Sequence, residues 1–465
     1  MLRLFDSATG EVRELTFRDP GRASMYVCGP TVSGLPHLGH GRFSLVWDVV
    51  RRWLTWHGLE VTYVSNITDI DDKIITRAKE EGRSEEDVVT EFEGEWWIAM
   101  DALGIERPDV APHATAYVDQ MVALLERLLS LDIAYVTSDG VYFDVSRVPD
   151  YGLLAGQPLE SLRAGARVEA NDDKRSPLDF ALWKLAKPGE PQWAAPFGAG
   201  RPGWHTECVV MSLDILGDGF DLHAGGLDLK FPHHENERAQ AVAVGDTFAR
   251  HWGHNGYVMV GNEKMSKSLN NFTSLTDLLA ETDQRAYRLL VLRSHYRSPV
   301  DVTKATITDA ERGLERLDAF ARRFEDAITI GDGFLRAADY NFDGASKELV
   351  DAVTRRVDDD LDTPGALALL FDAVSTANAW ADGAQRDEAR ELAHTVAVLF
   401  GAMGLSLSTT SDDVDDATRA LVEARDAARR ERNWNEADRL RDELVNNGWI
   451  VEDASGETVV RRAKR

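Results

Sequence analysis

The stretch MYVCGPTVSGLPHLGHGR, residues 25–42, constrains the fold of this chain more than any other segment. It opens with a short apolar run that favours a β-strand, and the Gly-Pro pair at 29–30 ends that run abruptly. An apolar-periodic run over 37–57 follows and predicts a helix. A strand, a glycine-bearing turn and a helix N-terminus are the usual geometry for holding the phosphates of a nucleotide. The stretch therefore predicts the first βα unit of a nucleotide-binding α/β fold.

A second strand is predicted over 60–67, EVTYVSNI, and it completes a strand-helix-strand unit that is typical of a doubly wound parallel sheet. Carboxylates follow this strand at Asp69, Asp71 and Asp72. They are candidates for binding a substrate ammonium. Asp71 and Asp72 are equally well explained as solvated residues at the N-terminus of the next helix.

The rest of the chain divides into segments that differ in composition and in periodicity. Residues 136–199 combine short strands with many Gly, Pro and Asp residues, which indicates an insertion between the two halves of the sheet. Beyond this insertion, helical periodicity dominates from 308 onward, with a short basic tail at 461–465. The predicted division is 1–95 for the first half of the catalytic domain, 96–200 for a connective insertion, 201–262 for the second half, 263–307 for a loop and connector, and 308–465 for a helical domain. The predicted fold class is α/β, with a Rossmann-type catalytic domain, an inserted connective domain and a C-terminal all-α bundle.

Composition bears on location and partners. The chain has no run of 18 uncharged apolar residues and no signal sequence, so we expect a cytoplasmic protein without membrane contact. A net charge of −27 ordinarily argues against a nucleic-acid partner, because phosphate contacts need Lys and Arg. Only 11 of the 52 basic residues are Lys. Such an acidic, lysine-poor surface suits high internal salt, where the Debye length falls to about 3 Å at 1 M.

The chain has only two cysteines, Cys28 and Cys208, and in a reducing compartment they point to metal or catalysis rather than to a disulfide. In KFPHHENE, His233 and Glu237 are four apart and project from one helical face. Two thiolates, an imidazole and a carboxylate suit Zn²⁺ better than Mg²⁺ or Ca²⁺. Spacing alone equally allows two core cysteines and a helix-capping histidine. Three more histidines stay open as candidate ligands, namely His205, His223 and His234.

Two further motifs suit a polyphosphate. In HLGH, His37 and His40 lie on the first helical turn, and Gly39 between them leaves room for a close ligand. In EKMSKSLNN, Lys264 and Lys267 belong to a predicted mobile loop from which they can reach phosphates from the opposite side. A surface histidine pair and an ordinary solvated loop are the alternative interpretations.

Taken together, PTVSGLPHLGHGR, GWHTEC, HAGGLDLKFPHHENE and EKMSKS resemble the class I aminoacyl-tRNA synthetases, and within them the cysteinyl-tRNA synthetases. The similarity extends over nearly the whole chain, including DDDLDTPGALALLFDAVSTAN at 358–378 and ARRERNWNEADRLRDELVNNGWIVED at 428–453. HLGH and KMSKS mark the class, and the cysteine pair with PHHENE marks the member.

The resemblance implies a ligase that activates L-cysteine with ATP to cysteinyl-adenylate and transfers it to the 3′ end of tRNA(Cys). It implies one Zn²⁺ per chain, held by Cys28, Cys208, His233 and Glu237 and joined by the substrate thiolate, together with Mg²⁺ bound with ATP. Coordination of the thiolate to the metal would separate cysteine from serine. A pocket that discriminates by side-chain size alone gives a difference in binding free energy of only about 1–3 kcal/mol.

The resemblance also implies roles for individual residues, and it implies that the C-terminal helices bind the tRNA anticodon. The catalytic residues are His37, His40, Lys264 and Lys267; the ATP-binding residues are His37, Gly39, His40, Asp228 and Lys267; and the substrate-binding residues are Thr68, Trp204 and His223. We expect a monomer. Two alternatives are a cysteine ligase that acts on an amino sugar, which lacks the final helical domain, and a non-catalytic tRNA-binding paralogue.

Overall fold

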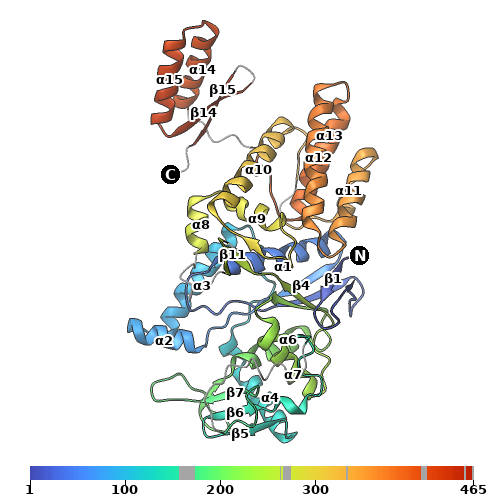
Figure 1. Ribbon diagram of the computed structural model, residues 1–465, viewed down its shortest axis with the longest axis vertical. Coiled ribbons are helices and arrows are strands. Elements are labelled where there is room, and N and C mark those ends of the chain that lie inside the picture. Colours follow the sequence, from blue (N-terminus) through green and yellow to red (C-terminus); the bar gives the residue numbers. More distant parts are fainter. Residues whose placement is uncertain are drawn as a thin grey trace.

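The computed structural model describes residues 1–156, 173–261, 263–264, 274–330, 333–409, 416–454 and 457–462. Figure 1 shows an elongated molecule whose central parallel sheet lies beneath a layer of long helices. A smaller antiparallel sheet lies at one end of the molecule, and the last two helices with a β-hairpin lie at the other.

The central sheet has the order β10-β9-β3-β4, and every neighbouring pair in it is parallel. Its strands are β3 (Arg22–Val27), β4 (Glu60–Val64), β9 (Leu222–Gly226) and β10 (Trp252–Asn255). The chain leaves β3 through a helix to β4 on one side, and β9 joins β3 on the other. Ligands of doubly wound sheets bind outside the carboxyl ends of the strands at such a switch point. The predicted doubly wound parallel sheet is therefore present.

The first crossover helix, α1 (Leu38–Trp56), begins directly after the predicted turn. Most of its residues are buried, because it lies between the sheet and the helices that cover it. Polar side chains on α1 are therefore satisfied internally. Asp48 accepts hydrogen bonds from Arg52 at 2.9 Å and from Arg288 of α9 (Gln284–Leu292) at 2.6 Å.

The insertion is built on an antiparallel sheet with the order β5-β6-β7-β8. Its strands are β5 (Ala134–Val136), β6 (Gly140–Phe143), β7 (Phe180–Leu185) and β8 (Gly200–Pro202). Before it come the helices α2 (Asp72–Glu81), α3 (Glu85–Ala102) and α4 (Val118–Ser130). After it, α6 (Trp204–Leu216) and α7 (Glu235–Ala243) return the chain to the central sheet.

Smaller elements complete the catalytic part of the chain. An N-terminal hairpin is formed by β1 (Arg3–Asp6) and β2 (Glu11–Glu14). A three-stranded sheet is formed by β11 (Val258–Val260), β12 (Glu263–Lys264) and β13 (Val300–Asp301). The helix α8 (Leu275–Glu281) precedes α9.

Helices dominate the remainder, as their periodicity predicted. They are α10 (Lys304–Arg323), α11 (Gly344–Val357), α12 (Thr363–Asp382), α13 (Arg386–Ala402), α14 (Asp416–Arg430) and α15 (Trp434–Asn446). The helical periodicity of the sequence runs through 417–447 without a break, but this stretch forms two helices, because the chain turns at Arg432, whose φ is +59°. After these helices the chain forms a hairpin of β14 (Trp449–Ala454) and β15 (Glu457–Arg462), which the sequence analysis did not predict and which takes up the first two residues of the predicted tail at 461–465. Among the described helices, none is both long and apolar enough to cross a membrane.

Candidate active site

A cavity of about 420 Å³ opens beyond the carboxyl ends of β3 and β9, at the switch point of the sheet. Six of the predicted site residues are among those that line it, namely Cys28, His37, Gly39, His40, Trp204 and Asp228. They come from the end of β3, from the start of α1, from the start of α6 and from the turn after β9. The fold therefore brings the two halves of the predicted site to one cavity.

The four predicted metal ligands come together next to this cavity, which Cys28 alone of the four lines. The candidate donor atoms of Cys28, Cys208, His233 and Glu237 all lie within 4.8 Å of one another. The two Sγ atoms are 3.7 Å apart, and Nε2 of His233 is 3.7 Å from Sγ of Cys208. The Oε1 atom of Glu237 lies 2.8 Å from Nε2 of His233. All four residues are at most 4% exposed.

Burial and mutual contact adjust the protonation of this cluster. A hydrogen bond from the Cys28 thiol lowers the pKa of Cys208 to about 6, while burial raises the pKa of Cys28 well above its usual value. Burial alone would lower the pKa of His233, but Glu237 and Cys208 together outweigh burial and raise this pKa to about 10. Burial likewise opposes ionisation of Glu237, but His233 and His223 hold its pKa well below the usual value. The charged groups of the cluster are thus the Cys208 thiolate, the His233 imidazolium and the Glu237 carboxylate. A metal ion that binds here would displace the protons of His233 and Cys28.

Neighbouring side chains orient the ligand residues. Nε2 of His223 lies 2.5 Å from Oε2 of Glu237, and Nδ1 of His205 lies 2.8 Å from Nδ1 of His233. The Trp204 ring stacks on the His233 ring, with centroids 3.9 Å apart and planes inclined by 16°. Such contacts fix the ring orientation and the donor atom of a ligand. His223 is fully buried behind Glu237, whereas Trp204 is 38% exposed and lines the cavity.

Two of the three histidines that the sequence left open form a second grouping. Cys28, His223, His234 and Glu237 also lie close enough together to share an ion. Nδ1 of His234, however, is 2.9 Å from Nε2 of His254. The first grouping has two sulfur atoms rather than one, and thiolates favour Zn²⁺. The donor chemistry therefore favours the grouping that includes Cys208 and His233.

The nucleotide end of the cavity is formed by the HLGH turn. His37 caps the N-terminus of α1, and the His37 and His40 side chains and backbones form a reciprocal capping box. The two imidazole rings stack with centroids 3.6 Å apart. They stand at the positive end of a helix, where anions are favoured. The side chain of Lys264 and the whole of Lys267 lie outside the described residues.

Two residues that the sequence analysis did not identify connect the cluster to Thr68. Asn66 accepts a hydrogen bond from the Gly29 amide at 2.9 Å and donates one to Oγ1 of Thr68 at 3.1 Å. Thr68 in turn donates to Glu207 at 3.1 Å. Burial and the nearby Cys208 raise the pKa of Glu207 well above its usual value, which keeps it from adding negative charge beside the thiols. Only the adjacency of Glu207 to Cys208 in the sequence could have pointed to it.

The carboxylates after β4 have structural contacts instead of facing the cavity. Asp71 caps α2 by accepting a hydrogen bond from the Lys73 amide, and Asp72 pairs with Lys184 at 2.7 Å. Asp69 accepts a hydrogen bond from the Thr115 amide at 2.9 Å. The helix-terminus interpretation is therefore the one that the structure supports for Asp71 and Asp72.

Residues 15–312 match the family described as tRNA synthetases class I (C) catalytic domain. A solved structure of Mycobacterium tuberculosis methionyl-tRNA synthetase in complex with methionyl-adenylate shares the fold, with a TM-score of 0.56 and 16% identity over 82% of this chain and 89% of that chain. Fold and site together thus define a class I aminoacyl-tRNA synthetase. Residues 352–408 match the DALR domain, and 411–461 match the cysteinyl-tRNA ligase anticodon binding domain.

Full-length relatives identify the member of the class. The cysteine–tRNA ligase of Alkalilimnicola ehrlichii is 44% identical over 99% of this chain and 100% of its own length. That of Thermotoga petrophila is 42% identical over 98% of this chain and 99% of its own. The chain belongs to the cysteine–tRNA ligase family. The resemblance inferred from the motifs is confirmed, and the match at 411–461 argues against the amino-sugar relative, which lacks this domain.

Proposed function

We propose that this chain activates L-cysteine with ATP and transfers it through cysteinyl-adenylate to the 3′ end of tRNA(Cys). One observation carries the proposal: two thiols, an imidazole and a carboxylate from three separate parts of the chain meet near the cavity that the HLGH turn lines. Membership in the cysteine–tRNA ligase family supports the same reaction.

The cluster fits a single Zn²⁺ by the chemistry of its donors. Cys28, Cys208, His233 and Glu237 offer two sulfurs, a nitrogen and an oxygen, which is within the usual ligand range of zinc. When bound, the ion would supply a soft acceptor for the substrate thiolate. Cys28 lines the cavity, so an amino acid bound there would lie next to the cluster.

The chain's own residues position the reactants. His37 and His40 would contact the phosphates of ATP from the N-terminus of α1, and Lys264 and Lys267 would approach them from the opposite side. The cysteine carboxylate attacks the α-phosphate and pyrophosphate leaves; the terminal ribose hydroxyl of the tRNA then attacks the acyl carbon and AMP leaves. Because no protein nucleophile is required, catalysis consists of positioning and charge stabilisation.

Substrate contacts complete the proposal. Trp204 would cover the amino acid, since its ring lines the cavity and stacks on His233. Thr68 and Asp228 would lie near the ammonium group or the ribose. His223 would support the substrate site from behind, through its contact with Glu237. Mg²⁺ would accompany ATP.

The proposed setting is the cytoplasm, where reducing conditions keep Cys28 and Cys208 as thiols. We propose a monomer with the five segments predicted above, in which the last one carries the anticodon. The family match at 411–461 supports that last assignment.

The test is cysteine-dependent exchange of pyrophosphate into ATP, followed by charging of tRNA(Cys). We expect exchange with cysteine and little with serine, and charging that depends on tRNA(Cys). Absence of exchange would contradict the activation step and favour a non-catalytic paralogue. Exchange without charging would instead point to another acceptor, such as an amino sugar.

A further inference from the structure

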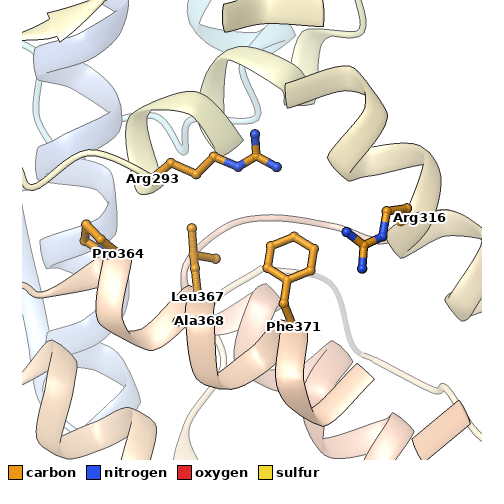
Figure 2. Close-up of a pocket in the computed structure, with 6 residues that line it drawn as sticks. All are labelled: Arg293, Arg316, Pro364, Leu367, Ala368 and Phe371. Carbon is orange, nitrogen blue, oxygen red and sulfur yellow. The ribbon is translucent and has the colours of Figure 1, made fainter. Parts of the chain in front are cut away.

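A second cavity lies away from the active site, in a groove between α10 and α12 beside the end of α9 (Figure 2). Its volume is about 280 Å³. Leu367 and Phe371 project from α12 into this groove, and the side chains of Arg293 and Arg316 reach over it from the opposite side. The groove thus combines an apolar floor with two guanidinium groups.

The Arg293 side chain crosses α10 at Gly313, where there is no room for a larger residue. A Cβ atom at Gly313 of α10 would overlap Nη2 of Arg293 and lie 3.1 Å from Cδ2 of Leu289. The absence of a side chain at this position lets the guanidinium lie against α10. Its ion pair with Asp309, at 2.8 Å, involves a carboxylate that is 70% exposed. Such a surface pair contributes little and yields readily to a stronger anion.

Arg316 follows Gly313 by one helical turn, so it lies on the same face of α10. Its guanidinium carbon is 5.7 Å from the centroid of the Phe371 ring. It makes no ion pair with any residue in the described part of the chain, although acidic residues outnumber basic ones by 79 to 52 overall. An arginine left beside an aromatic ring in so acidic a protein is available to an external anion.

An arginine pair next to a half-buried aromatic ring that lines a groove has the chemistry of a nucleotide site. Guanidinium groups bind phosphate in a bidentate manner, and aromatic rings stack with bases or sugars in single-stranded or looped RNA. A chain with a net charge of −27 repels a polyanion at long range, so RNA contacts must concentrate at local basic sites.

We propose that this groove binds one backbone phosphate of the tRNA, together with its adjoining nucleoside, at a point between the two ends of the molecule. Arg293 and Arg316 contact the phosphate, and the nucleoside packs on Phe371. Arg293 lies near the end of the catalytic match at 15–312, whereas Arg316 and Phe371 lie between that match and the anticodon-binding match at 411–461, so the groove belongs to the part of the chain that joins the two. This inference rests on the proposed function, because it assumes that tRNA is the acceptor.

The test compares Arg316→Ala and Arg293→Ala with the charge-matched control Arg355→Ala, an exposed arginine of α11 outside the groove. Binding of tRNA(Cys) transcript is measured by fluorescence anisotropy at several KCl concentrations. We expect each groove variant to weaken binding about five- to tenfold and to lower the slope of log affinity against log salt by about 1. The control should leave the slope unchanged.

Phe371→Leu separates stacking from charge. It keeps an apolar side chain but removes the aromatic ring, and we expect it to weaken binding severalfold while the salt slope stays at the wild-type value. Melting temperatures of all variants show that the fold is retained.

Cysteine-dependent pyrophosphate exchange tests the proposed function separately from the groove, because this reaction needs no tRNA. Wild-type protein without exchange would contradict the proposed function itself. Exchange with unchanged KM for ATP, combined with a raised KM for tRNA in charging, supports the groove. The inference is overturned if groove variants bind tRNA with wild-type affinity and slope, or if their defect is in the KM for ATP.

Discussion

Replacing Glu237 by glutamine removes one anionic donor from the cluster while retaining the shape of the side chain. Glu237 is fully buried, and its two oxygens contact His233 at 2.8 Å and His223 at 2.5 Å. The amide of glutamine retains one acceptor oxygen and presents N–H groups where the other oxygen was. We therefore expect weaker metal binding in a protein that still folds.

The magnitude follows from the number of ligands. Zinc binding to four-ligand peptide sites is worth about 10–16 kcal/mol near neutral pH, so one ligand accounts for roughly 2.5–4 kcal/mol. That difference is about a 100- to 1,000-fold change in dissociation constant. An amide oxygen recovers part of this loss, so the lower end of the range is expected for Glu237→Gln.

A matched control lies on the same helix. Glu235 is also fully buried, but it accepts a hydrogen bond from the Leu154 amide at 2.7 Å and pairs with Arg238 at 3.5 Å. Glu235→Gln should therefore lower stability and leave zinc affinity unchanged. The assay is metal analysis of each protein after dialysis against zinc buffers of defined free concentration.

Two outcomes would refute this reasoning. One is a Glu237→Gln protein that holds zinc as tightly as the wild type while Glu235→Gln loses it. The other is a wild-type protein without zinc that still activates cysteine and rejects serine. Either result would remove the assigned source of amino-acid selectivity.

Three further predictions concern stability, catalysis and salt. Asp48→Asn leaves the buried Arg52 and Arg288 without their counter-charge, so the free energy of unfolding in urea should fall by about 3–5 kcal/mol. Burial would raise the pKa of Asp48, but the two arginines hold it below its ordinary value. The difference in unfolding free energy between wild type and variant should therefore be full at neutral pH and shrink as pH falls below about 4. A difference that stays constant with pH would contradict this. Lys267→Ala should slow adenylate formation by an amount equivalent to about 3–4 kcal/mol of barrier in single-turnover assays, with a much smaller effect on ATP binding; equal losses in both would exclude a transition-state role. If the acidic surface reflects adaptation to salt, then stability and activity should rise between dilute and molar KCl, and indifference to KCl would reject that explanation.

The sequence by itself determined the parts that depend on local pattern. The βα unit around α1 follows from an apolar strand, a Gly-Pro break and helical periodicity. Each of these signals depends only on residues that are close together in the sequence. The HLGH turn could be placed at the start of α1 for the same reason, because helix capping is decided by adjacent residues. Residue chemistry likewise limited the metal to one that accepts sulfur.

The tertiary structure decided which distant side chains meet. Cys28 and Cys208 are 180 positions apart, and no spacing rule says that their sulfur atoms lie 3.7 Å from each other. The choice among the histidines depends on the same long-range packing, as does the position of Glu207 behind Thr68. The groove beside Phe371 is another such case, since it exists only where α10 packs near α12. Contacts between remote segments arise from the burial of whole faces, and that information is spread over the chain rather than held in any one motif.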